Sequence, residues 1–150
     1  MSRRIALSVV AGVVVLGGAG AFALAYAGDQ PPVLAHSTAH YTAPEKGRSG
    51  SFTFTTEVTA SSGVKSLKVL GWPEKSEFAK KQLTAKEMAE VESATCKPTG
   101  EHTARCVYKV PVTAADATSS QHGTWHVAVL ATAVDGSTTF DRKAADFTVG

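Results

Sequence analysis

The stretch Gly123–Gly136, which reads GTWHVAVLATAVDG, constrains the fold of this 150-residue chain more than any other. From Trp125 to Val134 two mainly apolar sets of residues alternate, and side chains along a strand point to opposite faces with a period of two. The pattern predicts one extended strand of about ten residues, buried on both faces as in the middle of a sheet. The Asp135-Gly136 pair that follows predicts a tight hairpin turn with positive backbone angles.

The first 27 residues have the organisation of a secretory signal peptide. Two arginines lie close to the initiator methionine, and Ile5–Ala27 then carries no charge and is almost wholly apolar. The stretch ends on small residues at Ala25 and Ala27, which predicts an N-terminal apolar signal helix, cleavage after Ala27 and a secreted, extracellular protein. The alternative is an uncleaved N-terminal anchor in the cell membrane, because about 20 apolar residues suffice to cross a bilayer.

The charge balance bears on the kind of partner. The whole chain has 15 basic and 13 acidic residues, and loss of residues 1–27 would remove two basic residues and no acidic one. The rest of the chain is then close to neutral, whereas nucleic acids and anionic surfaces require a basic face. We therefore expect no nucleic acid and no anionic surface as the main partner, and contact with a membrane only through an uncleaved leader.

Cys96 and Cys106 are the only cysteines, and an even count in an exported chain indicates one disulfide. The bond would close a loop with nine intervening residues. In the chain-entropy model such a loop stabilises the fold by roughly 3 kcal/mol. The segment between the cysteines contains Pro98 and Gly100 and predicts a hairpin joined at its base, with Cys106 facing the core. A pair of free buried thiols is the alternative.

Composition divides the rest of the chain into a spacer and a main domain. Residues 28–50 form an N-terminal spacer that includes a first edge strand near Val33–Tyr41. Residues 51–150 form the main domain. We expect this domain to be a single folded unit, because its length lies within the usual range for one domain.

Alternating patterns predict further strands in the main domain. Ser51–Ala60 has one apolar and one polar face, except that Thr56 interrupts the apolar one. Val64–Trp72 is also a strand, but its pattern does not decide which face points inward. After a segment of helical character, Ala94–Val112 is again predicted to be extended, and Thr113–Gln121 is predicted to be a polar connection.

The segment between these strands has helical character. Thr84 and Glu87 form a Thr-x-x-Glu capping box, and Leu83 and Met88 are placed for a hydrophobic staple. They predict one short helix from Ala85 to about Ser93. We interpret the helix as a connection between sheets, and an acidic helix that binds a partner is the alternative.

The last part of the chain predicts an irregular strand. Phe140 and Phe147 have opposite parity, so a bulge near Arg142 or Lys143 is needed to keep both rings inside. In total the patterns give six or seven strands at sandwich-like spacing, with one short helical insert and no βαβ alternation. The predicted fold class is all-β, an immunoglobulin-like antiparallel β-sandwich.

Two resemblances accompany these patterns. A tryptophan followed by alternating small apolar residues and an Asp-Gly turn, as at Trp125–Gly136, resembles the penultimate strand of bacterial immunoglobulin-like domains. The whole chain also resembles a family of short exported actinobacterial proteins, typically from Streptomyces, that is classed as a domain of unknown function. The motifs behind this second resemblance are the leader ending AFALAYAGD, the central SGVKSLKVLGWP, the Cys96–Cys106 segment and the terminal WHVAVLATAVDGSTTF with its closing DFTV. It implies export and an immunoglobulin-like fold, and it implies no activity and no catalytic residue.

Five histidines are the candidate metal ligands, namely His36, His40, His102, His122 and His126. Two pairs are spaced i, i+4, which places two ligands on one face of a helix, but both pairs fall in strand or loop segments. His122 and His126 could still meet another histidine across the sheet. We expect solvent-facing or sheet-surface imidazoles and no metal site.

The sequence contains no assembled pattern of an enzyme. It lacks a Gly-x-Ser-x-Gly elbow, an HExxH motif and a phosphate-binding glycine loop. Carboxylates for glycoside hydrolysis could come from Glu57, Glu101 and Asp116, but nothing singles them out. Asp135-Gly136-Ser137 is typical of a turn rather than of a calcium site. We therefore expect no catalytic residue and no cofactor.

Two functions follow from these expectations. The first is an exported, non-enzymatic binding or interaction module that holds an unknown protein or a cell-envelope partner through its loops or an open sheet edge. The alternative is a secreted protease inhibitor that presents a disulfide-braced loop around Lys97-Pro98-Thr99-Gly100. That segment is faintly similar to the Cys-rich loops of actinomycete subtilisin inhibitors, which have two disulfides where this chain can form one.

Overall fold

The structure is a computed structural model, and it describes residues 14–15 and 30–150. The predicted signal helix and its cleavage site at Ala25 and Ala27 lie outside the described residues, apart from the two residues of β1. The strands are β1 (Val14–Val15), β2 (Val33–Thr42), β3 (Gly50–Thr59), β4 (Val64–Pro73), β5 (Thr95–Pro98), β6 (Thr103–Val112), β7 (Gly123–Ala133) and β8 (Thr138–Val149). The helices are α1 (Glu77–Lys80), α2 (Ala85–Met88) and α3 (Ala114–Ser119). Among the described residues, no helix is long and apolar enough to span a membrane.

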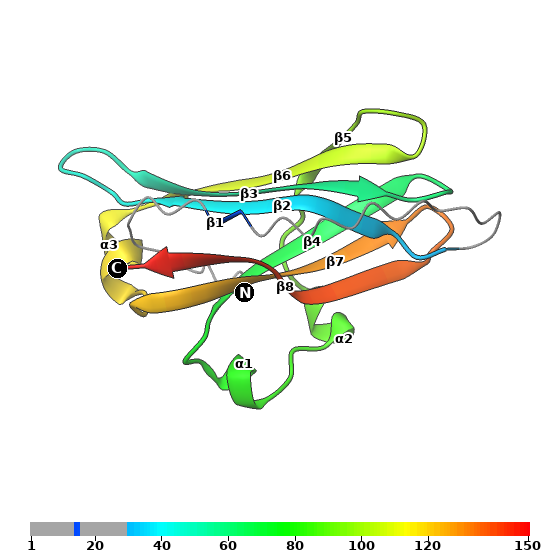
Figure 1. The fold of residues 1–150 in the computed structure, drawn as a ribbon. Helices are drawn as coiled ribbons and strands as arrows, with labels where there is room; N and C mark the ends of the chain where they lie inside the picture. Colours follow the sequence, from blue (N-terminus) through cyan, green and yellow to red (C-terminus); the bar gives the residue numbers. More distant parts are fainter. Residues whose placement is uncertain (1–13, 16–29) are drawn as a thin grey trace.

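The strands form two antiparallel sheets that face each other (Figure 1). One sheet has the order β1-β2-β3-β6-β5, and the other has the order β4-β7-β8. The space between them is filled by one apolar cluster whose members come from both sheets, the largest being Tyr41, Phe52, Phe54, Trp125 and Phe147. The predicted all-β fold of antiparallel strands is therefore confirmed, with three short helices in the described chain instead of one helical insert.

β7 is the central strand of the three-stranded sheet, as its alternating apolar pattern predicts. It pairs with β4 on one side and β8 on the other, and every residue from Trp125 to Ala131 is buried. Trp125, Val127 and Val129 point into the main core, whereas Ala128 and Leu130 point to the outer side of the sheet. Both faces of the strand are therefore covered.

A second apolar cluster covers the outer side of the sheet β4-β7-β8. Figure 1 shows α1 and α2 on this side, away from the other sheet. We call residues 74–93, which connect β4 to β5 and include both helices, the covering segment. The second cluster comprises Trp72, Leu83, Met88, Ala128 and Leu130. It explains why the pattern of β4 did not decide an inward face, since Leu67 and Val69 enter the main core while Trp72 enters the second cluster.

The predicted helix from Ala85 to about Ser93 is wrong at its end, because α2 ends at Met88. The predicted capping box is present at its start. After α2 the backbone hydrogen bonds run only from residue i+3 to residue i. Ala94 N–H then donates to the carbonyl oxygen of Leu67 at 2.8 Å, so pairing with β4 draws the chain out of the helix.

Two connections also differ from the prediction. Thr113–Gln121, predicted as a polar connection, contains α3, which begins with a capping box in which the Thr113 hydroxyl accepts from the Asp116 N–H at 3.1 Å. The turn between β7 and β8 has a positive φ only at Gly136 (89°) and not at Asp135. Gly136 N–H donates to the carbonyl oxygen of Ala133 at 3.0 Å, which is a type I turn followed by a left-handed glycine.

β8 contains the predicted bulge near Arg142 and Lys143, but the expected reason for it is wrong. Between two paired positions β7 advances by two residues while β8 advances by four. Two additional residues preserve the parity of the strand, because side chains alternate with a period of two. Phe147 therefore lies in the main core while Phe140 packs against the second cluster, on the opposite face of the sheet.

Candidate functional site

The two cysteines form the predicted disulfide in the β5–β6 hairpin. Cys96 and Cys106 are directly opposite each other in register, with their Cα atoms 4.0 Å apart. The Cys106 side chain lies in the main core, as predicted. Beyond the bond, two N–H groups of the hairpin tip donate to the carbonyl oxygen of Thr103 at 2.9 and 3.2 Å. Residues 97–100, the loop of the predicted inhibitor, therefore form the end of β5 and a short turn.

The five histidines occupy separate positions. His36 and His40 lie on β2, His102 lies in the β5–β6 turn, and His122 is exposed just before β7. His126 is buried within β7. In the described part of the chain no three His, Cys, Asp or Glu side chains are grouped so that they could hold a metal ion.

The carboxylates singled out in the sequence also have separate local contacts. Glu57 and Glu101 each lie 3.9 Å from the Nε2 atom of a neighbouring histidine. Asp116 accepts from a backbone N–H at the start of α3. Asp135 accepts from both the hydroxyl and the N–H of Ser137 at 2.6 and 2.8 Å, and these two bonds lower the pKa of the Asp135 carboxyl. The contacts of Asp116 and Asp135 are those of a helix cap and of a turn.

His126 is the centre of a polar cluster on the outer side of the sheet β4-β7-β8. Trp72, His126 and Asp146 are register partners across the three strands. The Nδ1 atom of His126 lies 2.5 Å from Oδ1 of Asp146, and its Nε2 atom lies 3.4 Å from Oε1 of Glu74 at the start of the covering segment. The ring also packs on Trp72, with 4.6 Å between ring centroids. The cluster therefore joins both edge strands and the covering segment to β7.

The same cluster is closed by residues from the bulge of β8. Trp72 Nε1 donates to the carbonyl oxygen of Arg142 at 3.0 Å, and the Arg142 guanidinium lies 5.7 Å from the Trp72 ring centroid. Arg142 Nη2 donates to the carbonyl oxygen of Phe78 in the covering segment at 3.1 Å. The His126 side chain is only 4% exposed, so a substrate could not touch it in this conformation. We interpret the cluster as a set of polar contacts that holds the covering segment on the sheet, rather than as a reaction centre.

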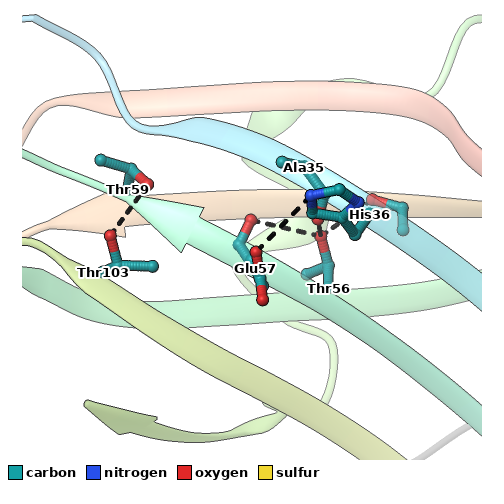
Figure 2. A network of polar contacts seen from close by, with 7 residues as sticks. Ala35, His36, Thr56, Glu57, Thr59 and Thr103 are labelled. Carbon is teal, nitrogen blue, oxygen red and sulfur yellow. Dashed lines mark hydrogen bonds and ion pairs between the residues drawn. The ribbon is translucent and has the colours of Figure 1, made fainter. Parts of the chain in front are cut away.

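A second polar network lies in the other sheet, where β2 contains a bulge. Between its pairings with Glu57 and Thr55 of β3, β2 has one residue more than its partner. The extra length is accommodated at His36, which has a φ of 54° and is the one non-glycine residue with positive φ in the described chain. Figure 2 shows His36 above β3, with Glu57 directed toward it and Thr56 beside Ala35.

The bulge explains why Thr56 interrupts the apolar face of β3. Thr56 is fully buried, and its hydroxyl lies 3.2 Å from the carbonyl oxygen of Ala35 and 2.8 Å from the hydroxyl of Ser37. A hydroxyl has one proton, so if Thr56 donates to Ala35, Ser37 donates to Thr56. The pair provides hydrogen bonds for polar groups that the bulge places inside the core.

The outer face of the sheet β2-β3-β6-β5 is rich in hydroxyl groups, and we call it the hydroxyl face. Register and exposure assign to it Thr38 and Thr42 of β2, Ser51, Thr53, Thr55 and Thr59 of β3, Thr95 of β5 and Thr103 of β6. No described Phe, Tyr or Trp side chain lies on it, and Val107 is its one exposed large apolar residue. Figure 2 shows Thr59 and Thr103 meeting across two strands of this face, with their hydroxyl oxygens 3.2 Å apart.

Charged residues on the hydroxyl face are mainly basic. Lys97 of β5 and Arg105 and Lys109 of β6 are all exposed there, and we call them the cationic stripe. Glu57 of β3 is the acidic residue of the face, and it lies opposite Arg105 in register. Its carboxylate contacts His36 instead, and no ion pair with the stripe is present among the described residues.

Tyr108 connects β6 to the covering segment. Its hydroxyl donates to a carboxylate oxygen of Glu92, in the covering segment, at 2.7 Å. Burial, and secondarily the hydrogen bond and charge of Glu92, raise the pKa of the Tyr108 hydroxyl above its ordinary value. The phenol therefore remains a hydrogen-bond donor through neutral and moderately alkaline pH.

The strands and their shared core define a small protein of two antiparallel sheets with one disulfide-linked hairpin. The chain belongs to DUF5707, a family of unknown function, whose model matches residues 34–131. The matched range begins in β2 and ends in β7, so it includes the cysteine pair, the hydroxyl face and the covering segment. No curated protein and no solved structure matches the chain.

Several features of these sites were not found in the sequence. The partnership of His126 with Asp146 and Glu74 depends on register across three strands, and only the alternation within β7 was visible. The hydroxyl face was visible in β3 alone, as alternating Thr53, Thr55 and Thr59. The capping box that starts α3 was present in the sequence as a Thr-x-x-Asp pattern and could have been recognised there.

Proposed function

We propose that this protein is an exported, non-enzymatic binding module with an immunoglobulin-like fold. The strand orders support the fold assignment. In constant-type immunoglobulin domains the two sheets have the orders A-B-E-D and C-F-G. If β2 to β8 are labelled A to G, the orders β2-β3-β6-β5 and β4-β7-β8 are the same. The disulfide differs, because it joins strands D and E of one sheet here, whereas antibody domains link the two sheets through B and F.

The observation behind the binding function is the difference between the two outer faces. The outer side of β4-β7-β8 is covered by apolar residues of the covering segment, with Leu83 and Met88 buried against it. No described element packs in the same way on the hydroxyl face, whose threonines remain half-buried or exposed. A broad face left open on a rigid two-sheet scaffold is a surface available to a partner.

The leader and the cysteine pair support export. The apolar leader ending at Ala25 and Ala27 has the pattern of a signal peptide, and a disulfide persists in oxidising compartments outside the cytosol. The partner proposed for the secreted protein is a component of the cell envelope or another extracellular protein. The protease inhibitor stays an alternative prediction, since Lys97 and Pro98 lie at the end of the braced hairpin.

Culture fractionation tests this proposal. We expect the protein in the supernatant or the envelope fraction, with a mature N-terminus at Gly28, and we expect purified protein to co-sediment with isolated envelopes in a saturable manner. An N-terminus at Met1 in the membrane fraction would support the anchor. Recovery from cytosol with both thiols reduced would contradict export. Lasting stoichiometric inhibition of subtilisin or trypsin would instead support the inhibitor.

A further inference from the structure

We propose that the hydroxyl face binds a phosphodiester-linked polymer of the cell envelope through the cationic stripe of Lys97, Arg105 and Lys109. The inference rests on the proposed function and names the chemistry of its ligand. It follows from how the basic side chains are placed on the face, from what neutralises them, and from which other kinds of side chain the face offers.

The placement of the stripe is unfavourable in the free protein. Lys97 and Arg105 are directly opposite each other across β5 and β6. Like charges at directly opposed positions destabilise a strand pair. Lys109 lies on the same side of β6, four residues from Arg105, which corresponds to about 13 Å along a strand. An anion between these cations would attract both of them and so offset their mutual repulsion. A polymer with several anionic groups could extend from one end of the stripe to the other.

The near-neutral charge of the chain without its leader does not exclude such a ligand, because the charges are unevenly distributed. The covering segment is nearly balanced, with five glutamates and four lysines, whereas the hydroxyl face is not. Among the described residues of the hydroxyl face, Glu57 is the one carboxylate beside the three cations, and it is turned to His36 (Figure 2). The expectation that an anionic surface is excluded considered only the total charge, whereas binding depends on the local field.

The other side chains of the face favour a phosphodiester over the remaining partners. Threonine hydroxyls and a guanidinium are donors that suit the non-bridging oxygens of phosphate. No aromatic side chain of the described residues is exposed on this face, so it offers no ring on which the flat face of a ligand ring could stack. Among its described residues Val107 is the one exposed large apolar side chain, so the face offers no aromatic or large aliphatic anchor, the usual energetic centre of a protein interface. Three cations are few for a nucleic acid, whose binding proteins commonly make 6–10 phosphate contacts.

The test measures binding of the purified full chain to synthetic poly(glycerol phosphate) by titration calorimetry over a range of salt concentrations. The first variant is Lys97→Gln/Arg105→Gln/Lys109→Gln. The control is Lys65→Gln/Lys75→Gln/Lys80→Gln, which makes the same change in net charge at three exposed lysines outside the hydroxyl face. We expect at least tenfold weaker binding for the stripe variant and less than twofold for the control. The slope of log K against log salt should fall by about 2 for the stripe variant, at roughly 0.7 per lost contact.

Specific outcomes would overturn the inference. They are the absence of saturable binding by a wild-type chain with native tryptophan fluorescence, an equal loss in both triple variants, or tighter binding to RNA or to an acidic protein than to the polymer. Arg105→Lys keeps the charge and should retain most of the salt slope. It therefore tests the role of charge even if the triple variant does not fold. If the stripe variant still co-sediments with envelopes, the binding module stands and the phosphodiester ligand is refuted.

Discussion

The hydroxyl pair of Ser37 and Thr56 gives the sharpest test of how the β2 bulge is held in the core. Thr56→Val keeps the shape of the side chain and removes its hydroxyl. It leaves the Ser37 hydroxyl and the Ala35 carbonyl group with fewer partners, and Ser37 is only 7% exposed. An unsatisfied buried polar group costs about 1–3 kcal/mol, so we expect the free energy of unfolding to fall by that amount.

The companion substitution should cost less. Ser37→Ala removes one hydrogen bond, but the Thr56 hydroxyl keeps its bond to the Ala35 carbonyl oxygen, so we expect a loss of about 0.5–1.5 kcal/mol. The double variant no longer contains an unpaired Ser37 hydroxyl. Its loss should therefore be smaller than the sum of the two single losses by roughly 1 kcal/mol, which is the coupling free energy of a contacting pair.

Urea unfolding followed by tryptophan fluorescence measures these differences, because both tryptophans, Trp72 and Trp125, are buried in the folded protein. Thr55→Val is the matched control, since Thr55 is the neighbouring hydroxyl on the outer face and should change the free energy by less than about 0.5 kcal/mol. Strict additivity of the two core substitutions, or a Thr56→Val variant as stable as the wild type, would refute this account of the bulge.

Three further predictions concern other parts of the fold. Reduction of the Cys96–Cys106 bond should lower the free energy of unfolding by about 3 kcal/mol, as measured in urea with and without reductant; no change would contradict the chain-entropy argument. The lowered pKa of Asp135 means that its contribution to stability is present above the ordinary carboxyl pKa and is lost as pH falls through the lowered value. Ser137→Ala should raise that pKa toward its ordinary range in an NMR titration, whereas an unchanged value would contradict the role of the hydroxyl. Met88→Ala should cost about 2–5 kcal/mol and speed amide exchange in the covering segment while exchange in β3 stays slow; uniform exchange throughout would contradict a separate second cluster.

Features that depend on local pattern were predictable from the sequence. The period of two in β7 predicted a central strand with two buried faces, and the spacing of Cys96 and Cys106 predicted a braced hairpin. The start of α2 was predictable because a capping box is a contact within four residues. Its end at Met88 was not, since Ala94 bonds to Leu67 of β4, far away in the sequence.

Register across strands was the main limit of prediction. The parity of Phe140 and Phe147 indicated a bulge in β8, but the number of additional residues decides which face each ring takes, and only pairing with β7 determines it. Thr56 was visible as an interruption in the apolar face of β3, but the partner that explains it, Ser37, lies on another strand.

The candidate sites could not be predicted for the same reason, because they too depend on register across strands. The five histidines were selected by residue type, yet what each one contacts depends on its strand neighbours, as the contact between His126 and Asp146 shows. The cationic stripe combines Lys97 with Arg105 only because the β5–β6 hairpin places them opposite each other. The composition shows only that the net charge without the leader is close to zero, and it does not show that basic residues are concentrated on one face.

The position of the disulfide determines how this fold would respond to mechanical tension. The continuous described stretch, residues 30–150, enters through β2 in one sheet and leaves through β8 in the other, and the only two cysteines of the sequence are in neighbouring strands of the first sheet. A force that pulls the two ends apart therefore acts on noncovalent contacts alone, and it detaches β2 and β8 before it reaches the covalent bond. Once the strands have separated, the loop closed by the bond stays out of the stretched chain and shortens its full extension by roughly 30 Å. The bond thus limits the extent of unfolding under load without raising the force at which the sheets part.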